Sequence, residues 1–138
     1  MSVEKTLQEK ILQYRILESR IETLNKQLNL ILNKMNELEQ TKNGLKELEK
    51  CKQLNFSLGS EVYVKGEVTD KKKVFVGIGA NIFIEKTFEE ATQILKKRKE
   101  ELEKIAQQIQ NEISNLLSIL QQIGKEIKKE VDKNVQPV

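Results

Sequence analysis

Apolar residues recur with a seven-residue period over the first third of the chain, in two rows offset by three residues. The first row contains Leu7, Tyr14, Ile21, Leu28 and Met35, and the second contains Leu17, Leu24, Ile31, Leu38 and Leu45. This is the a and d pattern of a coiled coil, with Lys10 and Lys42 as its polar exceptions. The pattern predicts a helix over residues 3–52, about 70 Å long at a rise of about 1.5 Å per residue.

The last third of the chain repeats this pattern. Its rows contain Leu95, Leu102, Ile109, Leu116 and Ile123, and Ala106, Ile113, Leu120 and Ile127. Thr87 and Glu90 have the spacing of a capping box, in which each side chain accepts a hydrogen bond from the backbone N–H of the other residue. We therefore expect a second helix over residues 87–135. Two helices of similar length can fold back as an antiparallel pair whose apolar rows cover each other.

The connector, residues 53–86, alternates with a period of two and is rich in β-branched residues, which predicts strands. We expect strands at 54–58, 61–68, 74–78 and 82–85, with turns at 69–73 and 79–81, and up to two hairpins. One predicted row contains Val62, Val64, Val68, Val74, Val76, Ile78, Ile82 and Ile84, and the opposite row contains Tyr63, Phe75 and Phe83. The fold class is α+β and mostly α: a long antiparallel two-helix coiled coil with two β-hairpins at the helix connection, in one domain over residues 1–138.

Both faces of this small sheet region need cover, because a sheet of this size is marginally stable alone and has exposed edges. Burial of an apolar side chain contributes about 1.5–3 kcal/mol. The eight residues of the first row are therefore predicted to be oligomerisation strands that join several chains.

Apolar residues outside the coiled-coil rows gather at the helix ends far from the connector. Ile11, Leu12 and Ile16 occupy positions e, f and c, and a closed two-helix pair does not cover positions f and c. Exposed apolar groups clustered at one end of a solvated coil indicate an interaction site. The predicted site, called the tip cluster, comprises Leu7, Ile11, Leu12, Ile16, Leu117, Ile119, Ile127, Val131 and Val135.

The composition argues against a catalytic site, a disulfide and a metal site in this chain. The 138 residues include no His, no Trp and a single Cys, Cys51, so the commonest general base and metal ligand are missing and an intrachain disulfide is ruled out. The Gly77-Ile78-Gly79 segment lacks the third glycine of a dinucleotide-binding loop. We expect no enzyme, no cofactor and no metal site.

The charge pattern does not suit a nucleic-acid-binding protein, and the hydropathy pattern does not suit a membrane protein. The 24 basic and 21 acidic residues are interspersed, and acidic neighbours dilute the basic segment 96–99. No stretch approaches the roughly 18 apolar residues of a membrane span, and Glu4 stands where a signal peptide would be apolar. A cytoplasmic protein is expected.

The order helix, two hairpins, helix is combined with short motifs in the connector. These are Leu58-Gly59, Tyr63-Val64, Gly66, Val68, Val74, Val76, Gly79, Glu85-Lys86-Thr87 and Ala91. In this order the chain resembles the alpha-class prefoldin subunits of archaeal type. The specific motifs cover about residues 58–91, and the chain departs from the usual pattern at Lys65, where the family often has proline, and at Ala80-Asn81, where glycine is common.

The resemblance implies an ATP-independent molecular chaperone, a holdase without cofactor. Two alpha and four prefoldin beta subunits would join their strands into a hexamer, capture unfolded polypeptide clients at the coiled-coil tips and transfer them to a group II chaperonin. The alternative is a structural coiled-coil spacer or a filament-forming prefoldin-like subunit without a client role. A nucleic-acid-binding helical arm is a weaker alternative, because neither helix carries a continuous basic stripe.

Overall fold

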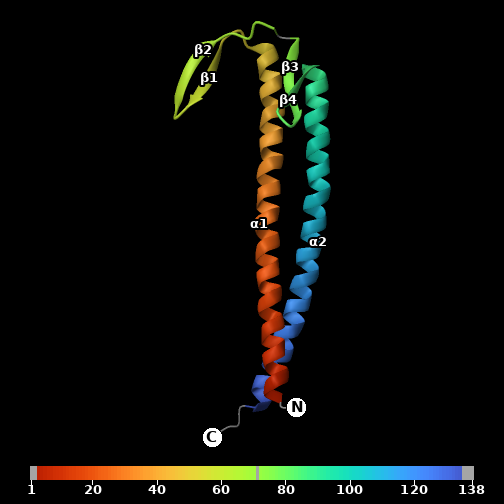
Figure 1. The fold of residues 1–138 in the computed structure, drawn as a ribbon. Coiled ribbons are helices and arrows are strands. Elements are labelled where there is room, and N and C mark those ends of the chain that lie inside the picture. Colours follow the sequence, from red (N-terminus) through yellow and green to blue (C-terminus); the bar gives the residue numbers. More distant parts are fainter. Residues whose placement is uncertain (1–2, 71, 135–138) are drawn as a thin grey trace. The chain divides into compact units, whose positions relative to one another are not determined.

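The computed structural model describes residues 3–70 and 72–134 as two helices that flank two pairs of strands (Figure 1). In chain order the elements are α1 (Val3–Lys50), β1 (Leu54–Gly59), β2 (Val62–Gly66), β3 (Lys73–Gly79), β4 (Ile82–Thr87) and α2 (Phe88–Asn134). This order confirms the predicted fold class. The residues form two compact units: unit 1 joins the start of α1, up to Leu32, with the end of α2, from Lys104, and unit 2 is Asn33–Glu103.

Unit 1 is an antiparallel helix pair held by the predicted apolar rows. Ile21, Leu24 and Ile113 form its buried core, and Leu24 is only 2% exposed. Half-buried residues of the same rows pack around this core: Leu28, Ile109, Leu116 and Leu120. Two ion pairs fix the direction, because Lys10 pairs with Glu130 while Arg20 pairs with Glu112. The coiled-coil prediction therefore holds in this unit.

Unit 2 contains both hairpins together with the adjoining helical segments. Leu38, Phe88 and Ala91 are its buried apolar residues among those described. The Arg98 guanidinium donates a hydrogen bond of 2.8 Å to the backbone carbonyl of Gly77, which ties β3 to α2. Lys99 pairs with Glu39 at 3.1 Å and ties α2 to α1. The second hairpin is thus tied to α2 by the Arg98 side chain, and α2 is tied to α1 by the Lys99–Glu39 pair.

The strands form two separate antiparallel pairs, β1 with β2 and β3 with β4. The central residues of the first turn, Ser60 and Glu61, have φ of 51° and 64°, and those of the second, Ala80 and Asn81, have φ of 49° and 59°. Two successive left-handed residues are the signature of a type I′ turn, whose twist matches that of the flanking strands. The predicted turn at residues 79–81 is confirmed.

The predicted strand over residues 61–68 is too long. The strand β2 ends at Gly66, which pairs with Leu54, the first residue of β1. Residues 67 and 68 therefore have no opposite residue in β1, and Val68 lies in the connection between the hairpins rather than in an oligomerisation strand. The predicted turn over residues 69–73 does not join two paired strands, because β2 and β3 belong to different sheets, and residue 71 lies outside the described residues.

The capping box at the start of α2 is confirmed. The Thr87 hydroxyl accepts a hydrogen bond of 3.1 Å from the Glu90 backbone N–H, and the Glu90 carboxylate accepts one of 3.2 Å from the Thr87 backbone N–H. The hydrogen bond that the carboxylate accepts from the Thr87 backbone N–H, together with the nearby Thr87 hydroxyl and the charge of Lys86, lowers the pKa of Glu90 below its usual value. Thr87 itself is the last residue of β4, so the helix begins directly where the strand ends.

Candidate interaction surfaces

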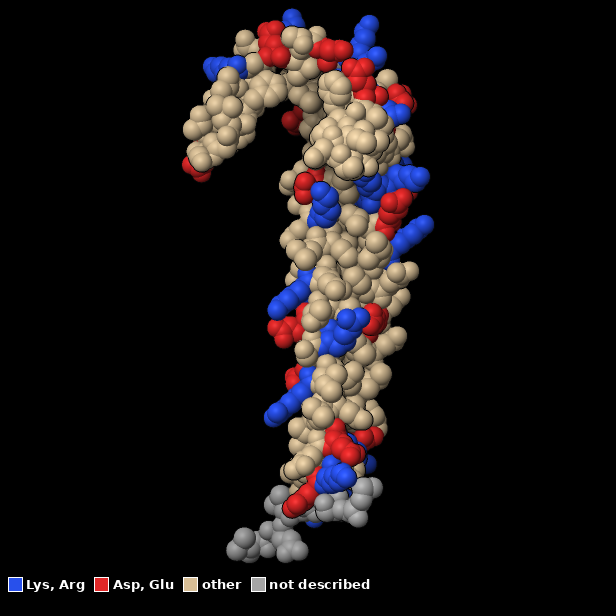
Figure 2. Space-filling model, in the orientation of Figure 1, with Lys and Arg blue, Asp and Glu red and all other residues tan. Residues whose placement is uncertain are grey.

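The β1–β2 hairpin carries an apolar face that the chain itself leaves uncovered. Phe56 pairs across the hairpin with Val64, and Val62 shares their face because side chains two residues apart in a strand point the same way. Phe56, Val62 and Val64 are 42–54% exposed, and Leu58 near the turn is 70% exposed. Figure 2 shows a hairpin surface made mainly of uncharged side chains. Several large apolar side chains are thus exposed together on one face of this hairpin.

The other face of this hairpin is mostly polar, which corrects the expectation that both faces need cover. Asn55 pairs with Lys65, and Ser57 pairs with Tyr63, the one aromatic residue on this side. Gly66 belongs to the apolar face, where a Cβ added to it would lie 2.9 Å from Cε2 of Phe56. The Phe56 ring therefore lies over the backbone of Gly66, and a side chain there would displace the ring.

The β3–β4 hairpin distributes its apolar residues differently from the prediction. Val74, Val76 and Ile84 are half-buried, and Val74 and Val76 line a pocket with Leu45 and Leu95 of the helices. The chain's own helices thus cover part of the β3–β4 residues in the row that was predicted to face other subunits. In the part of that row that lies on β3 and β4, Ile78 and Ile82, at the turn, are the residues that are more than half exposed.

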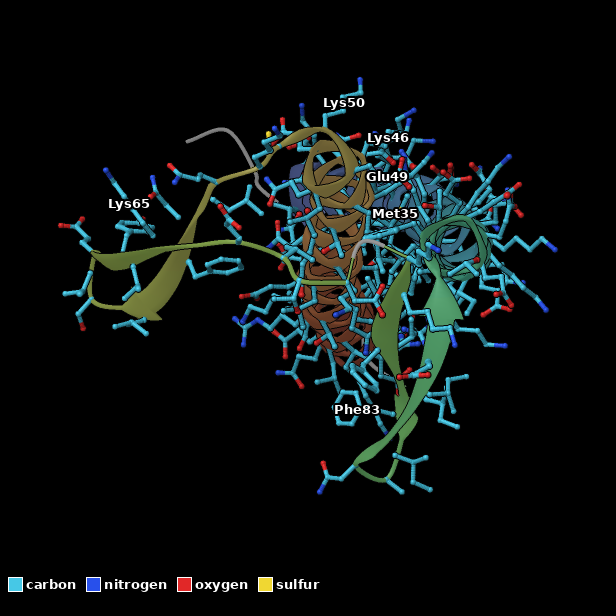
Figure 3. The ribbon with its side chains drawn as sticks, turned by 90° about the horizontal axis from the view of Figure 1, so that it is seen from above. Met35, Lys46, Glu49, Lys50, Lys65 and Phe83 are labelled. Atoms are coloured by element: carbon cyan, nitrogen blue, oxygen red, sulfur yellow. The ribbon has the colours of Figure 1, made fainter. Side chains whose placement is uncertain are left out.

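The opposite row of this hairpin is the more exposed one. Phe75 is 70% exposed and Phe83 is 63% exposed. The Phe83 ring lies over Gly77, where an added Cβ would be 3.1 Å from Cε1, and Figure 3 shows this ring projecting from the hairpin. The two phenylalanines are therefore the most exposed of the large apolar residues of the β3–β4 hairpin.

The tip cluster lies in unit 1, and its members differ in exposure. Leu12 and Ile16 are each 59% exposed, as positions f and c require. Leu117, Ile119 and Val131 are 42–48% exposed. Leu7, Ile11 and Ile127 are half-buried, because they lie in or beside the rows that join the helices, and Val135 lies outside the described residues. Five members of the predicted cluster are thus open to contact from outside.

Three further exposed apolar residues in unit 1 were not singled out from the sequence. Leu30 is 69% exposed, Leu32 46% and Ile105 44%. All three lie outside the a and d rows. The heptad pattern could therefore have identified them as exposed in the same way as Leu12 and Ile16.

Lys10, a polar exception in the apolar rows, is a paired charge. Its ammonium donates a hydrogen bond of 2.8 Å to Oε1 of Glu130 and lies 3.9 Å from Oε2 of Glu126. The hydrogen bond to Glu130 raises the pKa of Lys10. Oε2 of Glu130 is buried and has no hydrogen-bond partner among the described residues. The ammonium of Lys10 on α1 is thus balanced by carboxylates of α2.

The described residues contain no group of three or more His, Cys, Asp or Glu side chains arranged to hold a metal ion. Within the same residues, no helix combines the length and the apolar character needed to cross a membrane. The exposed surfaces described above are mainly apolar, so a partner would bind them by burying apolar area.

Two paired helices joined by exposed hairpins define a coiled-coil subunit of the prefoldin fold. The family model for prefoldin subunits matches residues 17–133, and the chain therefore belongs to the prefoldin family. The predicted resemblance to alpha-class archaeal prefoldin is confirmed by its relatives. The chain is 32% identical to prefoldin subunit alpha of Thermofilum pendens over 69% of this chain and 76% of that protein.

Two further comparisons bear on length and fold. Prefoldin subunit alpha of Methanopyrus kandleri is 37% identical over 53% of this chain, a match that spans 46% of that protein's length. A filamentous PFD from Methanocaldococcus jannaschii, solved by cryo-electron microscopy, superposes with a TM-score of 0.71 at 24% identity. The superposition covers 81% of this chain and 95% of the other, and it shows that the two share a fold.

Proposed function

We propose that this chain is a subunit of an ATP-independent molecular chaperone that captures unfolded polypeptides through the exposed members of the tip cluster. The observation that carries the proposal is the exposure of Leu12 and Ile16, each 59%, at the helix ends of a chain from a chaperone family. The captured client would then pass to a group II chaperonin. The protein would act in the cytoplasm, as a binding protein and not as an enzyme.

Assembly is the second part of the proposal. The uncovered apolar face of the β1–β2 hairpin, together with Phe75 and Phe83, would pack against prefoldin beta subunits, with two alpha and four beta subunits in the complex. Residues 1–138 would act as one prefoldin domain. Hairpins with exposed apolar faces are marginally stable alone, which supports their burial between chains.

Weak contacts at each tip suit this activity. Partial burial of a few side chains contributes only a few kcal/mol, which corresponds to a dissociation constant of about 1 mM. Several arms that engage one client raise its effective concentration at every further contact, so the complex holds a client firmly while each single arm releases it quickly. Release then needs no nucleotide hydrolysis.

The proposal is tested by the double variant Leu12→Ser, Ile16→Ser in the assembled oligomer. We expect unchanged assembly and a several-fold loss in the suppression of aggregation of a chemically denatured client, because the exposed apolar area at the tip is removed. Leu30→Ser is the matched control, since Leu30 is 69% exposed but lies outside the tip cluster. Full suppression by the double variant would exclude these residues as the client site.

The rival function is a spacer or filament subunit without clients. It predicts no suppression of aggregation by the wild-type oligomer, and a particle mass that grows with protein concentration. The exposed leucine and isoleucine at the tip favour the chaperone, because a spacer gains nothing from apolar side chains in water at the helix ends.

A further inference from the structure

One flank of the helix pair in unit 1 is opened by a glycine. Gly124 of α2 borders a pocket of about 420 Å³, and a Cβ added to Gly124 would lie 3.4 Å from Cε2 of Tyr14. The pocket is lined by Ile11, Tyr14, Arg15, Glu18, Gly124 and Ile127. Ligand pockets in proteins have volumes of about 300–1,000 Å³, so this one has room for a large apolar side chain.

A second pocket continues the first along the same flank. Its volume is about 320 Å³, and it shares Glu18 with the first pocket. Its lining consists of Glu18, Ile21, Glu22, Asn25, Lys26, Asn29, Leu117 and Leu120. Leu117, which is 42% exposed, precedes Gly124 by one heptad on α2. On α2 the linings of the two pockets are therefore one heptad apart, or roughly 10.5 Å along the helix axis.

We propose that these two pockets together bind an amphipathic helical segment that carries two large apolar side chains seven residues apart. The inference rests on the proposed function, since it specifies which conformation of a client segment the arm prefers. In a helix, residues i and i+7 lie on one face and are separated by roughly 10.5 Å, which is the spacing of the pockets. A helix that lies in an apolar groove is a common mode of peptide recognition.

An extended segment does not fit the same spacing. A strand rises about 3.3 Å per residue, so the residue about 10 Å away is i+3, and its side chain points to the opposite face. The residues on the same face, i+2 and i+4, lie about 7 and 13 Å away, so neither matches the spacing of about 10.5 Å on α2 as closely as residue i+7 of a helix does. The spacing on α2 therefore favours a helix over a strand.

The size and the charges of the groove indicate a transient client rather than a second copy of this chain. A stable protein interface buries roughly 800 Å² on each partner, whereas two side-chain pockets offer much less. Arg15, Glu18, Glu22 and Lys26 line the pockets with both signs of charge. Because the rim carries both signs of charge, it can accommodate amphipathic helices of positive or negative net charge.

The test uses the full-length chain in its oligomer and two fluorescein-labelled, alanine-rich helical peptides of identical composition. One peptide has leucines at i and i+7, and the other has them at i and i+5, on different faces of the helix. Fluorescence anisotropy is expected to show at least about tenfold tighter binding of the first peptide, because the second peptide can bury only one of its two leucines. The burial of one leucine contributes about 1.5–3 kcal/mol, which corresponds to a factor of about ten or more in the dissociation constant.

Two substitutions at Gly124 separate the pocket from helix stability. Gly124→Leu fills the pocket and is expected to weaken binding of the i,i+7 peptide by about tenfold, whereas Gly124→Ala is expected to preserve it. Alanine is the matched control because its Cβ meets Tyr14 at 3.4 Å, an ordinary contact distance, and alanine favours helix more than glycine does. Circular dichroism shows whether each variant keeps its coiled coil. If Gly124→Leu loses it, Leu117→Ser takes its place with the same expected loss.

Equal binding of the two peptides, or full binding by the pocket variant, would overturn the inference. If the wild-type oligomer suppresses client aggregation while both peptides bind equally, the inference fails and the proposed function stands. If the wild-type oligomer suppresses no aggregation, the proposed function fails as well.

Discussion

Leu24 and Leu30 lie on the same helix in the same unit, and they differ almost only in burial. Leu24 is 2% exposed and packs in the core with Ile21 and Ile113, whereas Leu30 is 69% exposed. Truncation of a buried leucine to alanine removes apolar contacts and leaves a cavity, which costs about 2–5 kcal/mol. The same truncation at an exposed helix position changes stability by no more than about 0.5 kcal/mol. We therefore expect Leu24→Ala to destabilise strongly and Leu30→Ala hardly at all.

The assay is thermal and urea unfolding of each variant, followed by circular dichroism at a fixed protein concentration because oligomerisation adds stability by mass action. For a chain of this size, 1 kcal/mol shifts the melting temperature by about 2–4 °C, so Leu24→Ala should melt roughly 10 °C lower. Leu30→Ala should melt within about 2 °C of the wild type. Equal shifts for the two variants would refute the assigned helix faces.

Three further predictions concern the hairpins and the capping box. Val64→Lys should place a charge on the uncovered face of the β1–β2 hairpin and dissociate the oligomer without loss of helix signal, as measured by light scattering; an intact oligomer would show that this face is not buried. Gly66→Ala should weaken assembly too, because the new Cβ would lie 2.9 Å from the Phe56 ring, and unchanged dissociation by dilution would argue against that packing. The pKa of Glu90 in the folded protein lies below its ordinary value of 4.5. The ionised Glu90 side chain therefore stabilises the folded state above pH 4.5, and this stabilisation is lost as the pH falls through the pKa of the folded protein. Glu90→Gln keeps the capping contact and should lessen the fall in melting temperature below pH 4.5, whereas an identical pH profile would contradict this.

Local patterns in the sequence predicted the elements whose determinants are themselves local. The heptad rows identified the helix faces, and the spacing of Thr87 and Glu90 identified the start of α2, because both signals depend on residues a few positions apart. The end of β2 was predicted wrongly because it depends on the pairing of Gly66 with Leu54, which a strand's own alternation does not encode.

Which face of a hairpin the chain covers depends on packing against distant segments. Val74 and Val76 are half-buried beside Leu95 of α2, while Phe75 on the other face is 70% exposed. The pocket beside Gly124 is likewise lined by Tyr14 of the other helix, and that placement depends on the register of the helix pair. A lone glycine in a helical pattern carries no such information by itself.

The central claim is that the tip contacts clients while the hairpins contact other subunits. Site-specific photo-crosslinking tests both halves in one measurement, with a photoreactive residue placed at Leu12 or at Leu58, which are 59% and 70% exposed. After illumination of the oligomer loaded with a denatured client, position 12 should give adducts with the client and position 58 adducts with another prefoldin subunit. Client adducts from position 58, or none from position 12, would contradict the account.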